Sequence, residues 1–122
     1  PESGRPIVLG FSQGGMVSFA LAAHHGAELA GAIPIAGGLP VSLRPNKPTA
    51  SPVMALHGDS DTVVPYFWGL ATANAFRDVN GGTSFHPFSG VGHRITAEMK
   101  QLMFEGILRF GALEKSARKK GK

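Results

Sequence analysis

A serine, an aspartate and a histidine in this chain each occupy a place where they could take part in nucleophilic catalysis. Ser12 lies in Gly-Phe-Ser-Gln-Gly, directly after a short apolar run, and Asp61 lies in His-Gly-Asp-Ser-Asp, after another. His93 follows Gly-Val-Gly on a polar stretch without apolar periodicity. A serine hydroxyl is a weak nucleophile until a base takes its proton and an acid orients that base. These residue types therefore indicate a Ser-His-Asp system, provided that the fold brings them together.

The residues around Ser12 predict a sharp turn between a strand and a helix. Gly10 and Gly14 flank the serine, and glycine lacks the Cβ that would crowd such a turn. The turn would lift the hydroxyl above the edge of a sheet and aim the backbone N–H of Gln13 at the reacting atom. We therefore expect a nucleophile elbow with Gln13 as an oxyanion donor.

The other acidic and histidine residues have simpler explanations. Asp59 follows Gly58 and is expected to hydrogen-bond the backbone of its own turn. His57 ends an apolar run and is expected to cap that turn, while His86 should face outward on a strand and be exposed. His24 and His25 close a predicted helix, where positive charge suits the helix dipole. The chain has no cysteine and no clustered His/Asp spacing, so we expect no metal and no cofactor.

The elements that must position these residues alternate along the chain. Short apolar runs predict strands over residues 6–10, 30–36, 52–57 and 83–88, and longer periodic stretches predict helices over residues 13–25, 65–79 and 97–110. Alternating strands and helices predict a parallel sheet with right-handed crossovers and helices on both faces. Because parallel strands end at the same edge of a sheet, Ser12, Asp61 and His93 should meet there.

Three motifs together resemble the carboxylesterase/acyl-protein thioesterase family of α/β-hydrolases. They are GFSQGG around Ser12, HGDSDTVVP around Asp61 and GVGH ending at His93, and GGLP at residues 37–40 is similar to a loop of that family. The likeness covers residues 5–110, and the order Ser, Asp, His is the one that this fold uses. The resemblance implies a serine hydrolase that cleaves carboxylic esters or thioesters through an acyl-enzyme. It also implies that Val63 lines the acyl pocket.

The sequence departs from the family in lacking its N-terminal half, which would hold the first strands and a second oxyanion donor. We therefore expect residues 1–113 to be the C-terminal half of the domain: a partial α/β-hydrolase fold of about four parallel strands with helices on both faces. The first strand would then be an exposed edge through which the chain could self-associate. The alternative is a catalytically silent fragment that associates with a complementary N-terminal half.

The net charge of +4 arises from the end of the chain, because basic residues gather at Lys115, Arg118, Lys119, Lys120 and Lys122. We expect residues 114–122 to form a basic, disordered tail. A third hypothesis for the function is an anion-binding module that uses this tail. No nucleic-acid partner is expected, because no aromatic residue interleaves with the charges.

The sequence also bears on location. No apolar run reaches the length of a membrane span and no signal peptide is visible, which favours the cytoplasm. The chain begins with Pro1 rather than Met, so we expect its natural N-terminus to lie upstream.

Overall fold

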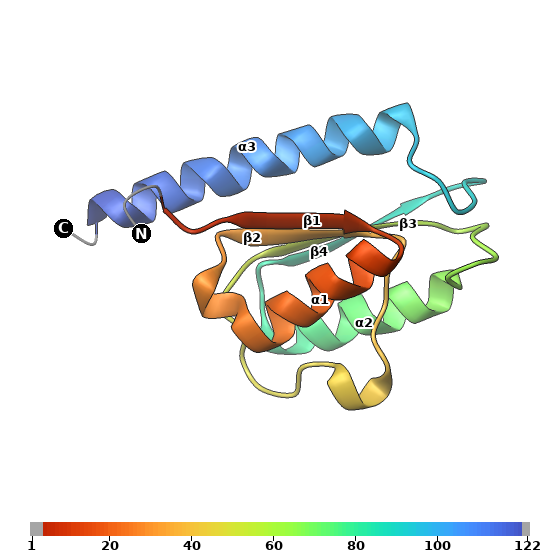
Figure 1. Cartoon of the computed structure of the whole chain (residues 1–122), viewed down its shortest axis with the longest axis horizontal. Coiled ribbons are helices and arrows are strands. Elements are labelled where there is room, and N and C mark those ends of the chain that lie inside the picture. The colour runs from red at the N-terminus through yellow and green to blue at the C-terminus, as the bar shows by residue number, and fades with distance from the viewer. Residues whose placement is uncertain (1–3, 121–122) are drawn as a thin grey trace.

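The computed structural model describes residues 4–120, and its strands and helices alternate along the chain (Figure 1). The strands are β1 (Ile7–Phe11), β2 (Gly31–Ile35), β3 (Val53–Gly58) and β4 (Thr83–Phe88). The α-helices are α1 (Gln13–His25), α2 (Tyr66–Val79) and α3 (Ala97–Lys120), and two 3₁₀ turns cover Gly26–Glu28 and Val41–Leu43. Each expected strand and helix is confirmed to within a few residues, except at the end of α3.

The four strands form one parallel sheet in the order β1-β2-β3-β4. Strand β2 is central and fully buried, although it contains Pro34. Proline has no N–H to donate to a ladder, and the pairs between β2 and β3 are Ala32 with Val53 and Ile35 with Leu56, on either side of the proline. The apolar run thus forms a strand despite its proline, because burial on both faces outweighs a missing donor.

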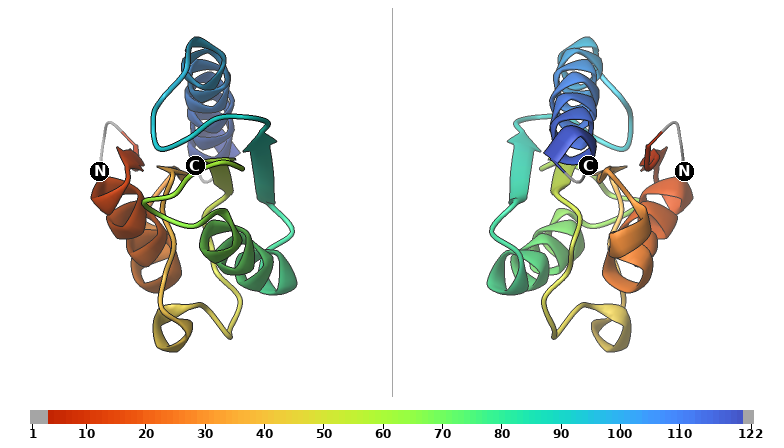
Figure 2. Two further views of the ribbon diagram at one scale, coloured as in Figure 1. Left: turned by 90° about the vertical axis from the view of Figure 1, so that its right-hand side faces the viewer. Right: turned by 90° about the vertical axis from the view of Figure 1, so that its left-hand side faces the viewer.

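Helices cover both faces of the sheet, as expected for this connectivity. Helices α1 and α2 lie on one face and α3 lies alone on the other (Figure 2). The first face encloses a core of small and aromatic side chains: Phe19, Ala22, Ala32, Leu39, Val53, Ala55, Ala73 and Phe76. The second encloses mostly large apolar side chains between the sheet and α3: Ile33, Ile35, Ala36, Met54, Leu56, Met99 and Phe110. The sheet therefore lies between two layers of helices. The loops that follow the strands lie at the carboxyl edge of the sheet, which the helices do not cover.

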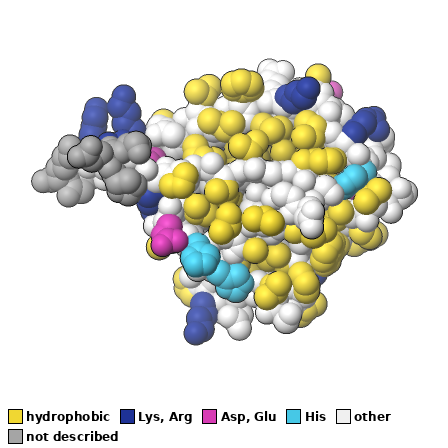
Figure 3. All heavy atoms as spheres, in the orientation of Figure 1, with side chains coloured by type: hydrophobic (Ala, Val, Ile, Leu, Met, Phe, Trp, Pro, Cys, Tyr) yellow, Lys and Arg dark blue, Asp and Glu magenta, His cyan; other side chains and the backbone are white. Residues whose placement is uncertain are grey.

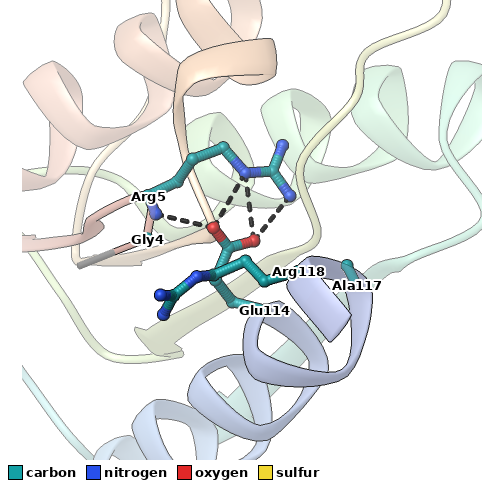
Figure 4. Close-up of a pocket in the computed structure, with 5 residues that line it drawn as sticks. All are labelled: Gly4, Arg5, Glu114, Ala117 and Arg118. Atoms are coloured by element: carbon teal, nitrogen blue, oxygen red, sulfur yellow. Dashed lines mark hydrogen bonds and ion pairs between the residues drawn. The ribbon is translucent and has the colours of Figure 1, made fainter. Parts of the chain in front are cut away.

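Helix α3 continues to Lys120, well past the Phe110 at which we expected it to end. The expectation of a disordered tail from residue 114 is therefore wrong for residues 114–120, and residues 121–122 lie outside the described part of the chain. Glu114 explains the extension, because its carboxylate accepts from Arg5 Nη2 at 2.8 Å and from the Arg5 backbone N–H at 2.6 Å (Figure 4). This contact ties the last turns of α3 to the segment that leads into β1.

Strand β1 is an edge of the sheet in the described residues, since it pairs with β2 alone. It lies at the front in Figure 1, and Figure 3 shows hydrophobic side chains spread over the same face. Leu9 on β1 is 44% exposed and Val17 on α1 is 53% exposed. The expected apolar edge is thus present, and an unpaired edge of this kind can pair with another chain.

Candidate active site

Ser12 lies on a strained turn between β1 and α1. Its φ of 60° and ψ of −113° are unusual for a residue with a side chain, and such strain persists only where the surroundings enforce it. Its N–H donates to the carbonyl of Ile35 at 2.8 Å, and its own carbonyl accepts from Met16 at 3.0 Å. A Cβ on Gly10 would collide with the Gly14 backbone, so the turn requires glycine at residue 10.

Of the two glycines expected to relieve crowding at this elbow, Gly10 does so and Gly14 does not, and Gly15 makes a further close approach. A Cβ at Gly14 would meet nothing within 4 Å, whereas a Cβ at Gly15 would lie 2.6 Å from the carbonyl oxygen of Ile35. Gly15 and Gly37 face each other where α1 crosses the end of β2. The glycine-rich stretch therefore serves both the turn at Ser12 and the packing of α1 on the sheet.

The three residues singled out from the sequence lie in one hydrogen-bonded chain. His93 Nε2 is 2.9 Å from Ser12 Oγ, and His93 Nδ1 is 2.8 Å from Asp61 Oδ2. A carboxylate can only accept, so Nδ1 carries the hydrogen and Nε2 is left as the acceptor for the serine hydroxyl. The arrangement can move a proton from Ser12 to His93 while Asp61 holds the ring in orientation.

Asp61 is fixed by the turn that follows β3. Its Oδ1 accepts from the backbone N–H groups of Val63 and Val64, both at 2.9 Å, and the residue is buried. Burial alone would raise the pKa of Asp61, but the hydrogen bonds from His93, Val64 and Val63 together hold it below its ordinary value. The carboxylate therefore stays charged where His93 needs it.

The loop that carries His93 is hydrogen-bonded to the turn that carries Asp61. Ser60 N–H donates to the carbonyl of Val91 at 2.9 Å, and Gly90 N–H donates to Asp59 Oδ1 at 2.8 Å. Asp59 was expected to bond its own turn, and besides Ser60 Oγ at 3.2 Å it accepts from this neighbouring loop. Asp59 therefore links the two loops and does not contact His93, which separates its role from that of Asp61.

The remaining residues singled out from the sequence lie around this chain of hydrogen bonds. Gln13 is the first residue of α1, so its N–H has no partner within the helix. The Val63 side chain is 66% exposed beside Asp61. His57 is buried and donates to the carbonyl of Val64, as expected for a capping role. His86 was expected to be exposed and is instead half-buried, with Nε2 3.0 Å from Ser84 Oγ.

The sequence reasoning missed Phe11, whose ring lies 4.7 Å from that of His93, centroid to centroid. Phe11 directly precedes Ser12 in the Gly-Phe-Ser-Gln-Gly motif. This position next to the serine is the one feature of the sequence that could have indicated its place in the site. Among residues 4–120, no three His, Cys, Asp or Glu side chains come together in a way that could hold a metal ion. The site is thus built from the serine, histidine and aspartate and from the backbone around them.

Comparisons with known proteins give one consistent result. A model of the family described as phospholipase/carboxylesterase matches residues 2–108. Acyl-protein thioesterase 1 of Neurospora crassa is 30% identical over an alignment of 101 residues that covers 77% of this chain and 41% of that protein. Acyl-protein thioesterase 1 homolog 1 of Dictyostelium discoideum is 30% identical over an alignment of 109 residues that covers 84% of this chain and 47% of that protein. The crystal structure of esterase PE8 superposes with a TM-score of 0.74 at 26% identity, covering 85% of this chain and 49% of that one.

The matches cover most of this chain but only part of each relative. This chain spans less than half the length of the two thioesterases that it matches. Within the described residues, no helix combines the length and the apolar character that a membrane crossing needs.

Proposed function

The chain belongs to the phospholipase/carboxylesterase family, and we propose that it carries the catalytic residues of a serine hydrolase that cleaves carboxylic esters or thioesters. The observation that supports this most strongly is the hydrogen-bonded series Ser12–His93–Asp61, with distances of 2.9 and 2.8 Å. A nucleophile, a base and an orienting acid within bonding reach are the requirement for acyl transfer to serine. The similarity to two acyl-protein thioesterases and an esterase points to the same chemistry.

The first half of the reaction forms the acyl-enzyme. Ser12 Oγ attacks the acyl carbon of the substrate while its proton passes to His93 Nε2. The carbonyl oxygen becomes an oxyanion, which the N–H of Gln13 at the N-terminus of α1 stabilises. When the bond to the alcohol or thiol breaks, His93 returns the proton to that leaving group, and the acyl group remains on Ser12.

The second half releases the acid. His93 Nε2 takes a proton from water, and the oxygen of that water attacks the acyl carbon. The intermediate collapses with Ser12 as leaving group, which takes the proton back from His93. Asp61 keeps its charge throughout and stabilises the imidazolium of His93 in both halves. No cofactor enters any of these steps.

The exposed Val63 side chain gives the proposal its substrate contact. Its backbone N–H holds Asp61 Oδ1, so its Cβ lies close to the triad on the turn after β3. An exposed aliphatic side chain on the turn that carries the acid of the triad is available to contact the acyl chain of the substrate. We therefore assign Val63 to acyl binding, with a small-molecule ester or thioester as the substrate class.

Turnover of a p-nitrophenyl ester and of a matched thioester by Ser12→Ala and Ser18→Ala variants tests the proposal. Ser18 is a buried serine of the same helix whose hydroxyl donates to the Gly14 carbonyl at 2.8 Å, so it controls for the loss of a hydroxyl from α1. We expect Ser12→Ala to reduce turnover at least about 10³-fold and Ser18→Ala to leave it within a few-fold. Equal turnover in both variants would contradict the proposal and favour a catalytically silent fragment.

A further inference from the structure

His57 lies close to the triad, and the proposed mechanism gives it no part. It lies on β3, four residues before Asp61, and is 1% exposed. Its Nε2 lies 3.6 Å from Asp61 Oδ2, the oxygen that receives the hydrogen bond from His93. Burying an ionisable ring this close to the acid costs free energy unless its ring nitrogens are hydrogen-bonded.

The ring of His57 is hydrogen-bonded to Val64, and Val64 is in turn hydrogen-bonded to Asp61. His57 Nε2 lies 2.8 Å from the carbonyl oxygen of Val64, which can only accept, so Nε2 carries the hydrogen. The N–H of the same Val64 donates to Asp61 Oδ1 at 2.9 Å. Val64 is therefore bonded at both of its backbone groups, on one side by the histidine and on the other by the acid.

The position of the ring is set from the other side by α2. A Cβ on Gly69 would collide with His57 Nδ1, so the first turn of α2 leaves space for the ring only because it has glycine there. Tyr66 meets the ring edge-on with centroids 5.9 Å apart. The ring is thus confined between the helix and the turn, and it cannot rotate away from Val64 without displacing one of them.

The charge state of His57 suits a support that does not compete with the base. Burial lowers its pKa and outweighs the opposite effects of the Val64 carbonyl and the Asp61 carboxylate. A neutral ring with its single hydrogen on Nε2 donates that hydrogen to the Val64 carbonyl. It therefore does not compete with His93 for a hydrogen bond to Asp61 Oδ2. A second positive charge here would instead oppose the charge that His93 gains during the reaction.

We propose that His57 is a positioning residue, whose Nε2–H bond to the Val64 carbonyl fixes the turn that presents Asp61 to His93. This inference rests on the proposed hydrolase function. It goes beyond a capping role, because it predicts that the alignment of the base depends on one nitrogen of a side chain that the reaction never touches. A residue that only filled space at the end of β3 would tolerate any substitute of similar size and polarity.

The variants His57→Gln and His57→Asn separate the two roles. The side-chain amide nitrogen of glutamine falls near the place of Nε2 and can donate to Val64, whereas that of asparagine falls near the place of Nδ1 and cannot. We expect the rate at which a fluorophosphonate labels Ser12 to stay within a few-fold in His57→Gln. In His57→Asn we expect it to fall about tenfold, the order of one lost hydrogen bond. Thermal unfolding of both variants shows whether they are equally folded.

A second measurement does not depend on reactivity. In chain labelled with ¹⁵N-histidine, NMR should report hydrogen on Nε2 of His57 and on Nδ1 of His93, and the His93 proton should be strongly downfield because it bonds Asp61. That downfield proton should persist in His57→Gln and weaken in His57→Asn. Equal labelling rates in two folded variants, or hydrogen on Nδ1 of His57, would overturn the inference.

The two measurements also separate this inference from the proposed function. If wild-type chain is not labelled at Ser12, the proposed hydrolase function fails, and the His93 proton still decides whether His57 positions the acid. If neither variant folds, hydrogen on Nδ1 of the wild-type His57 ring would overturn the inference, and hydrogen on Nε2 together with the downfield His93 proton would support it.

Discussion

Replacing Asp61 by asparagine should disable the base while leaving the fold almost unchanged. Asp61 Oδ1 accepts two backbone N–H groups, from Val63 and Val64, so that place in the turn needs an oxygen. An asparagine must therefore put its carbonyl oxygen there and its NH₂ group in the place of Oδ2, facing His93. A donor in that place forces hydrogen off His93 Nδ1 and onto Nε2. With hydrogen on Nε2, the ring can no longer accept the proton of Ser12.

The expected loss follows from this change of tautomer. Loss of the orienting carboxylate in a serine triad lowers kcat by up to about 10⁴-fold, which corresponds to about 5.4 kcal/mol of barrier at about 1.36 kcal/mol for each factor of ten. The assay is steady-state hydrolysis of a p-nitrophenyl ester by the chain joined to the N-terminal half of a family member. We expect kcat to fall and KM to change little, because Asp61 is buried beneath His93 and does not face the substrate.

Asp59→Asn is the matched control for this substitution. Asp59 is exposed, and its Oδ1 accepts from Gly90 N–H and Ser60 Oγ, so an asparagine oxygen can keep both bonds. We expect kcat within a few-fold of wild type and a stability cost of no more than about 1 kcal/mol. A larger loss of kcat in Asp59→Asn than in Asp61→Asn would refute the assignment of the acid.

Three further expectations concern parts of the chain outside the triad. Removing residues 115–122 should leave turnover within a few-fold, because the truncated chain keeps Glu114 and its contacts with Arg5. Hydrogen bonds from Arg5 lower the pKa of Glu114 to about 2 from an ordinary 4.5. The ion pair therefore stabilises the fold above about pH 4.5, and its contribution is lost as the pH falls toward 2. In Glu114→Gln, the thermal unfolding midpoint should therefore decrease less than in wild type as the pH falls from about 4.5 to about 2. Because β1 is an unpaired apolar edge, the isolated chain should self-associate on size-exclusion chromatography. It should also hydrolyse a p-nitrophenyl ester at least about 10²-fold more slowly than the same chain joined to the N-terminal half of a family member, a factor that corresponds to one oxyanion donor.

Each of these expectations has a clear contrary result. Abolished turnover after truncation would give the basic end of α3 a part in the chemistry. An unchanged acid sensitivity in Glu114→Gln would mean that the pair with Arg5 contributes nothing to the stability of the fold. A monodisperse and fully active monomer would mean that the chain covers the β1 edge and builds its oxyanion site from its own residues.

The meeting of Ser12, Asp61 and His93 could be predicted because it depends on topology more than on detail. Each residue follows a short apolar run, and parallel strands separated by helices end at one edge of the sheet. The sequence reports those runs directly through their apolar content and the glycines around them. The order of the strands then places the loops side by side, so no knowledge of side-chain conformation was needed.

The length of α3 could not be predicted, because it depends on a contact between distant parts of the chain. The residues after Phe110 are rich in lysine and include Gly111, which locally favours a frayed end. The pair between Arg5 and Glu114 joins residues 109 positions apart, and nothing in the local pattern indicates it. Phe11 against His93 and Asp59 against Gly90 were missed for the same reason, since each contact joins two segments that are distant in sequence and that only the folded sheet brings together.

Reaction with a fluorophosphonate probe, followed by peptide mass spectrometry, tests the central claim most directly, because this reagent phosphonylates a serine only when a base activates it. We expect one adduct on the peptide that contains Ser12, its loss in Ser12→Ala and its retention in Ser18→Ala. An adduct on a different residue, or equal labelling of wild type and Ser12→Ala, would contradict the account.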